Sequence, residues 1–255
     1  MRISKVSFAY DTKDILKQLS LEIKSGKVTT ILGANGSGKS TLFSLLTKVY
    51  RPQAGTIFLN EKDIQAIRRK DFSKEVAIVY QQNTVEDDVT VYQLVSYGRI
   101  PHMKRFKGKQ KEDEKAIEWA LKVTGLAAYR EQEMGKLSGG QRQRAFIAMA
   151  LAQQTKILLL DEPTTFLDIR YQIEILELIR KLNSKYHLTI VMILHDINQA
   201  ICYSDEIIGL KDGEISVQGK TKEVITETTI EELYGLKLKV GQIDGTPFVW
   251  TMRKY

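Results

Sequence analysis

Glycine, lysine and hydroxyl side chains gather in one short stretch, Gly33–Thr41, with the spacing G-x-x-x-x-G-K-S. Gly36 and Gly38 permit backbone angles that a Cβ would forbid, so several N–H groups can point at one anion. In such a loop Lys39 reaches the outer phosphates of a nucleotide, and the Ser40 hydroxyl ligates Mg²⁺. The predicted phosphate-binding residues are Gly33, Ala34, Asn35, Gly36, Ser37, Gly38, Lys39, Ser40 and Thr41.

Two carboxylates follow an apolar run much later in the chain. Lys156–Leu160 has the pattern of a buried strand, and Asp161 and Glu162 come directly after it. Ligands of parallel α/β sheets bind at the carboxyl ends of the strands. Asp161 is therefore placed to hold Mg²⁺, directly or through a water, and Glu162 to orient and deprotonate an attacking water. In the alternative interpretation, the two acids cap the next helix.

A second glycine pair begins a predicted helix over residues 139–152. Two glycines at a helix start present bare N–H groups and the positive end of the helix dipole to an anion. The pattern therefore predicts a second phosphate-binding element. It consists of Leu137, Ser138, Gly139, Gly140 and Gln141.

The elements that must position these residues can be read from hydrophobic periodicity. Apolar alternation or short apolar runs predict strands over residues 1–10, 15–23, 28–32, 56–59, 76–79, 156–160, 189–194, 206–211 and 214–217. Helical spacing predicts helices over residues 42–47, 139–152, 169–184, 197–203 and 228–234, and helical character between 89 and 122. The chain therefore reads as an α/β domain interrupted by a helical insertion, roughly residues 83–150.

Composition excludes some classes of protein. The chain has 255 residues, of which 43% are hydrophobic, enough to bury a substantial core. Its longest apolar runs, such as Ile190–Leu194, are far shorter than the roughly 18–20 residues of a membrane span. Its one cysteine, Cys202, rules out an internal disulfide and fits a reducing cytoplasm.

The formal net charge of +7 is compatible with nucleic acid or with anionic lipid headgroups. Basic residues are concentrated in Arg99–Lys111, which we interpret as a solvated loop. A surface that faces anionic headgroups is the alternative interpretation. The basic side chains of this run are Arg99, Lys104, Arg105, Lys107, Lys109 and Lys111.

The order of these motifs resembles that of the ATP-binding-cassette (ABC) family over essentially the whole chain. The order is Gly33–Thr41, Gln81, Leu137–Gln141, Asp161-Glu162, Asp168 and His195. The resemblance implies an α/β fold: a P-loop NTPase core of ABC type with a helical subdomain insertion and an N-terminal antiparallel β portion. It also implies one nucleotide-binding domain over residues 1–255, with its core at about 1–82 and 151–220, the helical subdomain at about 83–150 and a tail at about 221–255.

The resemblance also assigns roles in ATP hydrolysis. Gln81 is similar to the glutamine that touches Mg²⁺ and the attacking water, and Glu162 matches the catalytic base. His195 matches the switch histidine that contacts the γ-phosphate, although a lone histidine is more often a core or helix-capping residue. Tyr10 corresponds to the aromatic residue that stacks on adenine, with core packing as the alternative. The implied cofactors are ATP and Mg²⁺, the latter held by Ser40, Gln81 and Asp161.

Members of this family work as head-to-tail dimers. Each ATP lies between the phosphate loop of one cassette and the signature, here Leu137–Gln141, of the other. Asp168 falls in the loop that crosses the dimer, where Phe166 is bulkier than the small residue common at its position. The resemblance implies a homodimer on two transmembrane permease subunits, at the cytoplasmic face of the membrane and peripheral to it. It further implies an extracytoplasmic substrate-binding protein and no nucleic acid.

Several short sequence segments indicate which group within the ABC family this chain resembles. The segments that resemble iron–siderophore, haem and cobalamin importers are Val89–Val91, Tyr97–His102, His195–Ala200, Tyr234–Leu236 and Asp244–Pro247. We therefore expect an ATPase that powers uptake of an iron chelate, a ferric siderophore in the first instance. Haem or cobalamin import is the alternative, and a soluble ABC ATPase of metal-cluster assembly or nucleic-acid metabolism is a more distant one. No heptad run lies between Lys39 and Leu137, which argues against chromosome-organising relatives.

Overall fold

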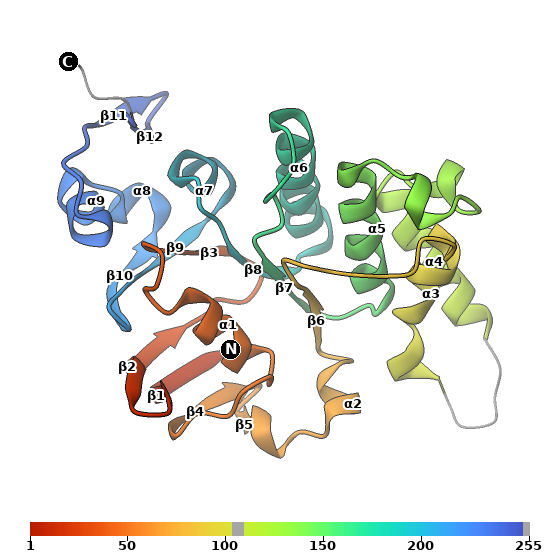
Figure 1. Cartoon of the computed structure of the whole chain (residues 1–255), viewed down its shortest axis with the longest axis horizontal. Coiled ribbons are helices and arrows are strands. Elements are labelled where there is room, and N and C mark those ends of the chain that lie inside the picture. Colours follow the sequence, from red (N-terminus) through yellow and green to blue (C-terminus); the bar gives the residue numbers. More distant parts are fainter. Residues whose placement is uncertain (104–109, 252–255) are drawn as a thin grey trace. The chain divides into compact units, whose positions relative to one another are not determined.

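The computed structural model describes residues 1–103 and 110–251, which form two compact units. The first unit combines Met1–Ile67 with Thr189–Tyr255, and the second is Arg68–Leu188. Figure 1 labels the elements of both. The predicted split into core, helical subdomain and tail follows other boundaries and stays a prediction. Of the predicted basic run, Lys104, Arg105, Lys107 and Lys109 lie outside the described residues.

The first unit begins with an antiparallel sheet, in agreement with the predicted N-terminal β portion. Its strands lie in the order β2-β1-β4-β5. Alternate residues of β1, including Ile3, Val6 and Phe8, are buried, which explains why the alternating sequence forms a half-buried strand. The bounds are β1 Arg2–Tyr10, β2 Lys13–Glu22, β4 Ala54–Leu59 and β5 Lys62–Asp63.

Parallel strands form the centre of the first unit. β3 pairs in parallel with β8 on one side and with β9 on the other, and β10 closes this edge in antiparallel orientation. Every residue of β3 and β8 is buried, as expected for parallel strands covered on both faces. The bounds are β3 Val28–Leu32, β8 Thr189–Ile193, β9 Glu206–Lys211 and β10 Glu214–Lys220.

Helices follow two of these strands directly: α1, Lys39–Leu46, after β3, and α7, Ile197–Tyr203, after β8. Beyond β10 come two short helices and a hairpin that the sequence analysis identified only in part. The remaining elements of the first unit are η1 Ile64–Ala66, α8 Thr221–Val224, α9 Glu227–Tyr234, β11 Val240–Ile243 and β12 Thr246–Val249.

The second unit contains two parallel strands and most of the helices. β6 pairs with β7 in a register that sets Val79 opposite Leu160. Figure 1 shows α3, α4 and α5 packed together, and their apolar residues, such as Val95, Leu121 and Ile147, are buried. The bounds are α2 Arg69–Phe72, β6 Val76–Val79, α3 Val91–Tyr97, η2 Ile100–His102, α4 Lys111–Val123, η3 Ala127–Tyr129, η4 Met134–Lys136, α5 Gly139–Ala152, β7 Ile157–Asp161 and α6 Ile169–Tyr186.

The chain after α3 is held tightly against the end of α5. A Cβ on Gly98 would lie 2.1 Å from the Met149 carbonyl oxygen, so the backbones approach closely here. The buried Arg99 guanidinium pairs with Asp113 at 2.9 Å and donates to the Ala152 carbonyl at 2.7 Å. Burial raises the pKa of Asp113, but the Gln110 N–H and the Arg99 charge outweigh burial and hold it below its ordinary value.

No helix within the described ranges is both long enough and apolar enough to cross a membrane.

Candidate active site

The phosphate loop lies between β3 and α1 in the first unit. Its first residue, Gly33, has a φ of 150°, and a Cβ there would meet the Leu210 carbonyl oxygen at 2.2 Å. Gly38, with a φ of 104°, begins α1 in the left-handed region that glycine favours. Lys39 is 5% exposed, and its Nζ donates to the Gly33 and Ala34 carbonyls at 2.8 and 2.9 Å. The lysine thus spans the loop and holds it in a closed curve.

The loop leaves donors that fit phosphate oxygens. Within the described part of the chain, no side chain caps the N-terminus of α1. The Ser37 hydroxyl is buried and has no hydrogen-bond partner among the described residues. Uncapped helix N–H groups and a buried hydroxyl would each cost stability if they stayed unsatisfied. A phosphate group would supply the acceptors, so the residues present fit a nucleotide.

Three aromatic rings gather near the end of β1. Tyr10, which is 42% exposed, makes edge contacts with Phe8 and Tyr50 at centroid distances of 5.0 and 5.6 Å. A hydrogen bond with Tyr10 raises the pKa of the Tyr50 hydroxyl. The exposure of Tyr10 does not fit the core-packing alternative and leaves ring surface available for a base. Tyr50 is a member of this cluster that the sequence analysis did not find.

His195 lies in the turn between β8 and α7 of the first unit. Its side chain is exposed, which does not fit a core histidine. The N-cap of α7 is Asp196, whose carboxylate accepts from the Gln199 N–H at 2.9 Å, so His195 is not the cap either. Both structural alternatives to the predicted switch role are thereby removed, and the role itself stays a prediction.

Gln81 and Glu162 meet in the second unit. Because Val79 on β6 faces Leu160 on β7, the residues two positions later also lie opposite each other. The Gln81 amide donates to Glu162 Oε2 at 2.5 Å, and the Thr165 hydroxyl donates to the same oxygen at 3.1 Å. Glu162 has a φ of 48°, an uncommon value for a residue with a side chain and one that often marks a functional position.

Asp161 is the last residue of β7 and is half-buried. Neither Asp161 nor Glu162 caps α6, because the N-cap of that helix is Asp168. Among the described residues, no group of three or more His, Cys, Asp or Glu side chains could hold a metal by itself. The predicted Mg²⁺ contacts Ser40, Gln81 and Asp161 offer oxygen donors, which suit a hard cation that also takes oxygens from a phosphate.

The signature, Leu137–Gln141, begins α5. The Ser138 hydroxyl accepts from the Gln141 N–H at 3.3 Å, and the Gln141 side chain accepts from the Ser138 N–H at 2.9 Å, a complete capping box. Gly140 packs on the ring of Tyr171, where a Cβ would lie 2.3 Å from the ring. The Tyr171 N–H donates to Asp168 at 3.1 Å. Tyr171 therefore connects the signature to the predicted cross-dimer loop, a link with no signal in the sequence.

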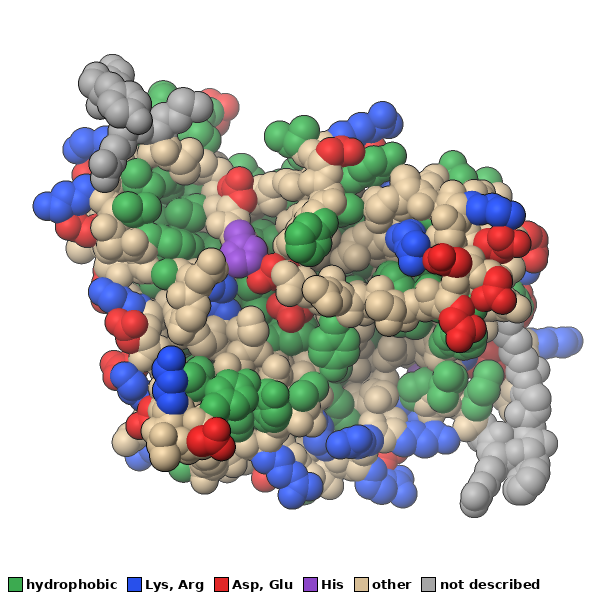
Figure 2. All heavy atoms as spheres, in the orientation of Figure 1, with side chains coloured by type: hydrophobic (Ala, Val, Ile, Leu, Met, Phe, Trp, Pro, Cys, Tyr) green, Lys and Arg blue, Asp and Glu red, His purple; other side chains and the backbone are tan. Residues whose placement is uncertain are grey.

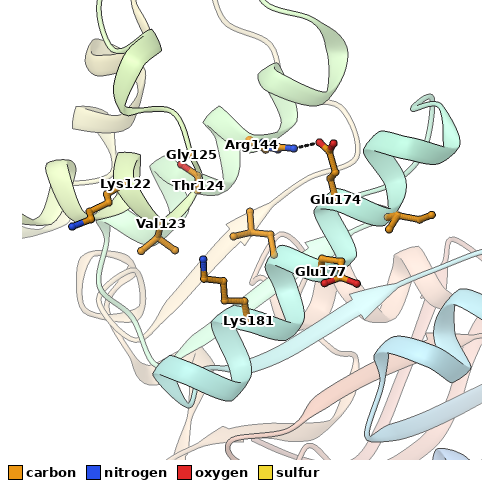
Figure 3. Close-up of a pocket in the computed structure, with 10 residues that line it drawn as sticks. Lys122, Val123, Thr124, Gly125, Arg144, Glu174, Glu177 and Lys181 are labelled. Carbon is orange, nitrogen blue, oxygen red and sulfur yellow. Dashed lines mark hydrogen bonds and ion pairs between the residues drawn. The ribbon is translucent and has the colours of Figure 1, made fainter.

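Among the described residues of the second unit, two hollows are considered as possible binding surfaces. One, of about 570 Å³, is lined by Thr84, Val85, Glu86, Val89 and the 45% exposed Tyr97. The other, of about 450 Å³, lies between α4, α5 and α6. Figure 3 shows Arg144 of α5 reaching Glu174 of α6 across this second hollow. That ion pair ties the signature helix to α6 and occupies charges that a ligand would need.

Acidic side chains partner many of the basic ones. In the first unit Lys24 lies 2.7 Å from Glu206 and Lys220 lies 2.9 Å from Glu223. In the second unit Arg130 contacts Glu114, Glu118 and Glu131. On the face seen in Figure 2, basic and acidic side chains are intermixed over much of the surface. These pairs neutralise individual basic side chains locally, and the formal net charge of +7 is the excess of basic over acidic residues that remains.

Comparison with known proteins gives a consistent result. The family model described as "ABC transporter" matches residues 16–165. The petrobactin import ATP-binding protein FpuC of Bacillus anthracis is 42% identical over 96% of this chain and 90% of that protein. The ferric enterobactin transport ATP-binding protein FepC of Escherichia coli is 41% identical over 98% of this chain and 93% of that protein.

A solved structure shares the fold. It is described as a metal-chelate type ABC transporter in an inward-facing conformation and superimposes with a TM-score of 0.83. The sequences are 27% identical, and the match covers 97% of this chain and 94% of that one. With its phosphate loop, its signature and its motif order, this chain belongs to the ABC transporter family and has the fold of its ATP-binding cassettes.

Proposed function

We propose that this chain is the ATP-hydrolysing subunit of an importer that takes up a ferric siderophore. The observation that carries the chemistry is the contact between Gln81 and Glu162, which presents a carboxylate with fixed orientation at the ends of two parallel strands. The names of the relatives, importers of petrobactin and enterobactin, support the class of cargo. Haem and cobalamin importers are the nearest alternative.

In this proposal Glu162 is the general base. Its Oε2 accepts from both Gln81 and Thr165, so the carboxylate cannot rotate freely and is held to receive a proton from an attacking water. His195 contacts the γ-phosphate, and Tyr10 stacks on adenine. Bound Mg²⁺, with contacts from Ser40, Gln81 and Asp161, would neutralise charge on the phosphate oxygens.

The signature acts on the nucleotide of a second copy. Leu137–Gln141 begins a helix, and Asp168 of the cross-dimer loop is linked to it through Tyr171. Both elements are proposed to face ATP held by the partner's phosphate loop. A chain with Lys39→Ala mixed with one carrying Ser138→Arg retains one intact composite site per heterodimer. We expect ATPase activity above that of either variant alone; full turnover by a strict monomer would reject the dimer.

The hollow beside Tyr97 is the proposed binding site for a segment of a permease subunit. Its lining is mixed, with the apolar Val85 and Val89 and an exposed aromatic ring beside the polar Thr84 and Glu86, which suits a short amphipathic helix. Two permease subunits and an extracytoplasmic binding protein would complete the importer, with this chain peripheral at the cytoplasmic face of the membrane. Tyr97→Arg should lower recovery of the chain on permease-containing membranes and leave ATP binding unchanged.

The decisive biochemical experiment replaces Glu162 with glutamine. ATP binding should persist, while turnover should fall by at least about 100-fold, the size of a general-base contribution. Glu177→Gln, the same change at an exposed position on α6, is the matched control and should hydrolyse ATP normally. Wild-type turnover by Glu162→Gln would disprove the assignment of the base.

The cargo is tested separately in cells. Deletion of the gene for this chain should abolish uptake of radiolabelled ferric siderophore, and the wild-type gene should restore it. Haem and cobalamin uptake are measured in the same strains. Loss of either of these with normal siderophore uptake would replace the cargo assignment but leave the ATPase assignment intact.

A further inference from the structure

The chain from α9 to β12, residues 227–249, supplies none of the predicted site residues described above. Its α9 ends at Gly235, which has a φ of 68°. Its hairpin turns at Asp244 and Gly245, whose φ values of 49° and 70° suit a two-residue turn with both central residues left-handed. This ordered segment contains two motifs from the sequence analysis, Tyr234–Leu236 and Asp244–Pro247. The proposed mechanism of ATP hydrolysis gives neither motif a role.

One side chain of α7, that of Asn198, makes two hydrogen bonds to the hairpin. The Asn198 amide donates to the Val249 carbonyl at 3.0 Å, and its oxygen accepts from the Val249 N–H at 2.9 Å. An asparagine side chain here takes the place that a peptide group of a neighbouring strand would take. Val249 is fully buried and Asn198 is half-buried, so both hydrogen bonds are partly shielded from water and cost stability when left unmade.

Asn198 belongs to the first turn of α7 and lies three residues after His195. That turn is held twice: from within by the Asp196 cap on the Gln199 N–H, and from outside by the hairpin through Asn198. The His195 side chain is exposed, so close packing restricts it less than it would restrict a buried side chain. The backbone of this turn therefore contributes to where the imidazole lies.

The same segment also touches the phosphate loop. The Tyr234 hydroxyl, on the last residue of α9, lies close enough to the Gly33 backbone and to the Asp196 carboxylate for both to affect its pKa. Leu233 fixes α9 on β9, since a Cβ on Gly209 would lie 2.8 Å from its side chain. Tyr234 thereby lies near both the first glycine of the loop and the turn of His195.

We propose that residues 227–249 form a brace that positions the turn of His195 relative to the phosphate loop, with Asn198 and Tyr234 as positioning residues. This inference rests on the proposed function of His195 in ATP turnover. A group that acts on a reacting phosphate must be held within a fraction of an ångström, whereas nucleotide affinity comes mainly from the phosphate loop. Loosening the brace therefore affects turnover more than binding.

The test uses Asn198→Leu in the full-length chain, which removes both hydrogen bonds and keeps a side chain of the same branched shape. We expect kcat for ATP to fall about tenfold, with the dissociation constant for ATP within about twofold of wild type. Gln218→Ala is the matched control: Gln218 also donates its amide to a backbone carbonyl, that of Glu22 at 2.8 Å, but it lies on the edge strand β10 and belongs neither to α7 nor to the hairpin. This control should keep wild-type kcat.

Hydrogen exchange separates positioning from general destabilisation. In Asn198→Leu the amides of residues 195–199 should exchange faster, while those of β3 and β8 keep their protection. Accelerated exchange throughout the first unit, with kcat and ATP affinity lost together, would mean a merely structural role and overturn the brace.

His195→Ala makes failure of the brace distinguishable from failure of the proposed function. An inactive His195→Ala beside an Asn198→Leu with wild-type kcat overturns the brace alone. Wild-type turnover by His195→Ala removes the proposed role of His195 and the brace with it.

Discussion

Two helices of this chain begin with glycines, and their first turns are satisfied in opposite ways. The N-terminus of α5 is complete in itself, because Ser138 and Gln141 form a reciprocal capping box. The N-terminus of α1 begins at Gly38 in the left-handed region, and no side chain of the described residues caps it. The first N–H groups of an uncapped helix can bind an anion. In a capped helix, some of these N–H groups already donate to the capping side chain.

The difference shows that similar glycine motifs can serve different tasks. The phosphate loop is closed by its own Lys39, and Tyr234 approaches its Gly33 from α9. The signature instead holds its own shape and adds Gly140 packed on Tyr171. We expect the first motif to determine nucleotide binding and the second to affect turnover once nucleotide is bound. Four predictions test this contrast.

Lys39→Ala should have the largest effect. The change removes the cation that closes the loop and that would meet the outer phosphates, so ATP affinity should fall by roughly 100-fold, equivalent to about 3 kcal/mol. Lys48→Ala, just beyond the other end of α1, is the control and should bind ATP normally. Titration of a fluorescent ATP analogue measures both. Tight binding by Lys39→Ala would contradict the dependence of the loop on this residue.

We expect the protein to lose stability in alkali, because Tyr234, which approaches the phosphate loop from α9, ionises there. Burial raises the pKa of Tyr234 to about 12 from an ordinary value of 10.0. The folded state therefore holds the Tyr234 hydroxyl proton more tightly than the unfolded chain does. The stabilisation of the folded state that follows from this is fully present below pH 10 and is lost as pH rises towards 12. Wild type should lose roughly 2–3 kcal/mol more than Tyr234→Phe over this interval, as measured by urea unfolding. Parallel curves for the two proteins would refute the prediction.

Gly140→Ala should disturb the signature through the ring of Tyr171. The added Cβ would lie 2.3 Å from the ring, so something must shift, and overpacking of this kind costs about 1–3 kcal/mol. ATP turnover should fall while ATP binding at the phosphate loop stays normal. Gly139→Ala is the control for stability, because its Cβ would meet Leu167 at an ordinary 3.5 Å. Equal unfolding midpoints for the two variants would argue against the Tyr171 contact.

Ser138→Ala should have the smallest effect on stability. Loss of the capping hydroxyl should cost about 1 kcal/mol, the usual value for a helix N-cap. Ser138→Asp, which keeps an acceptor at the cap, should restore most of this loss. Denaturant unfolding of the full chain provides the measurement. An unchanged midpoint in Ser138→Ala would show that the capping box contributes little and that the two helix starts differ less than the hydrogen bonds indicate.

Local pattern was enough to predict much of the fold. β3 and β6 have the predicted bounds, and α5, α7 and β9 also match, because buried runs, glycine stops and helix caps are written in neighbouring residues. The hairpin β11–β12 was missed, although Asp244-Gly245 is a turn signal, because its four-residue strands show little alternation. The helices α2 and α8 were missed because each has only four residues, about one turn, which is too short to show a helical period.

The residues of the candidate site also fall into two groups: those that local sequence motifs predict, and those that only the folded chain brings together. Motif spacing was sufficient to select Lys39, Gln81 and Glu162, and the register of β6 and β7 explains why the last two meet. Tyr171, Asn198 and Tyr234 have no motif of their own. Each acts on a partner more than 30 residues away or, for Tyr234, on an element that precedes it by about 200 residues, so their contacts exist only in the folded chain. The His195 and Tyr10 roles stay predictions, although their exposure removes the simpler explanations.

The close contact between the end of α3 and the end of α5 has a mechanical consequence. Tyr97 in the hollow precedes Gly98 and Arg99, which hold this chain against Met149 and Ala152 at the last turn of α5. The first turn of that helix carries Ser138, and its 14 residues span about 21 Å. Because a helix is stiff along its axis, a displacement of the chain at Gly98 and Arg99 would be passed along α5 towards the signature at its opposite end.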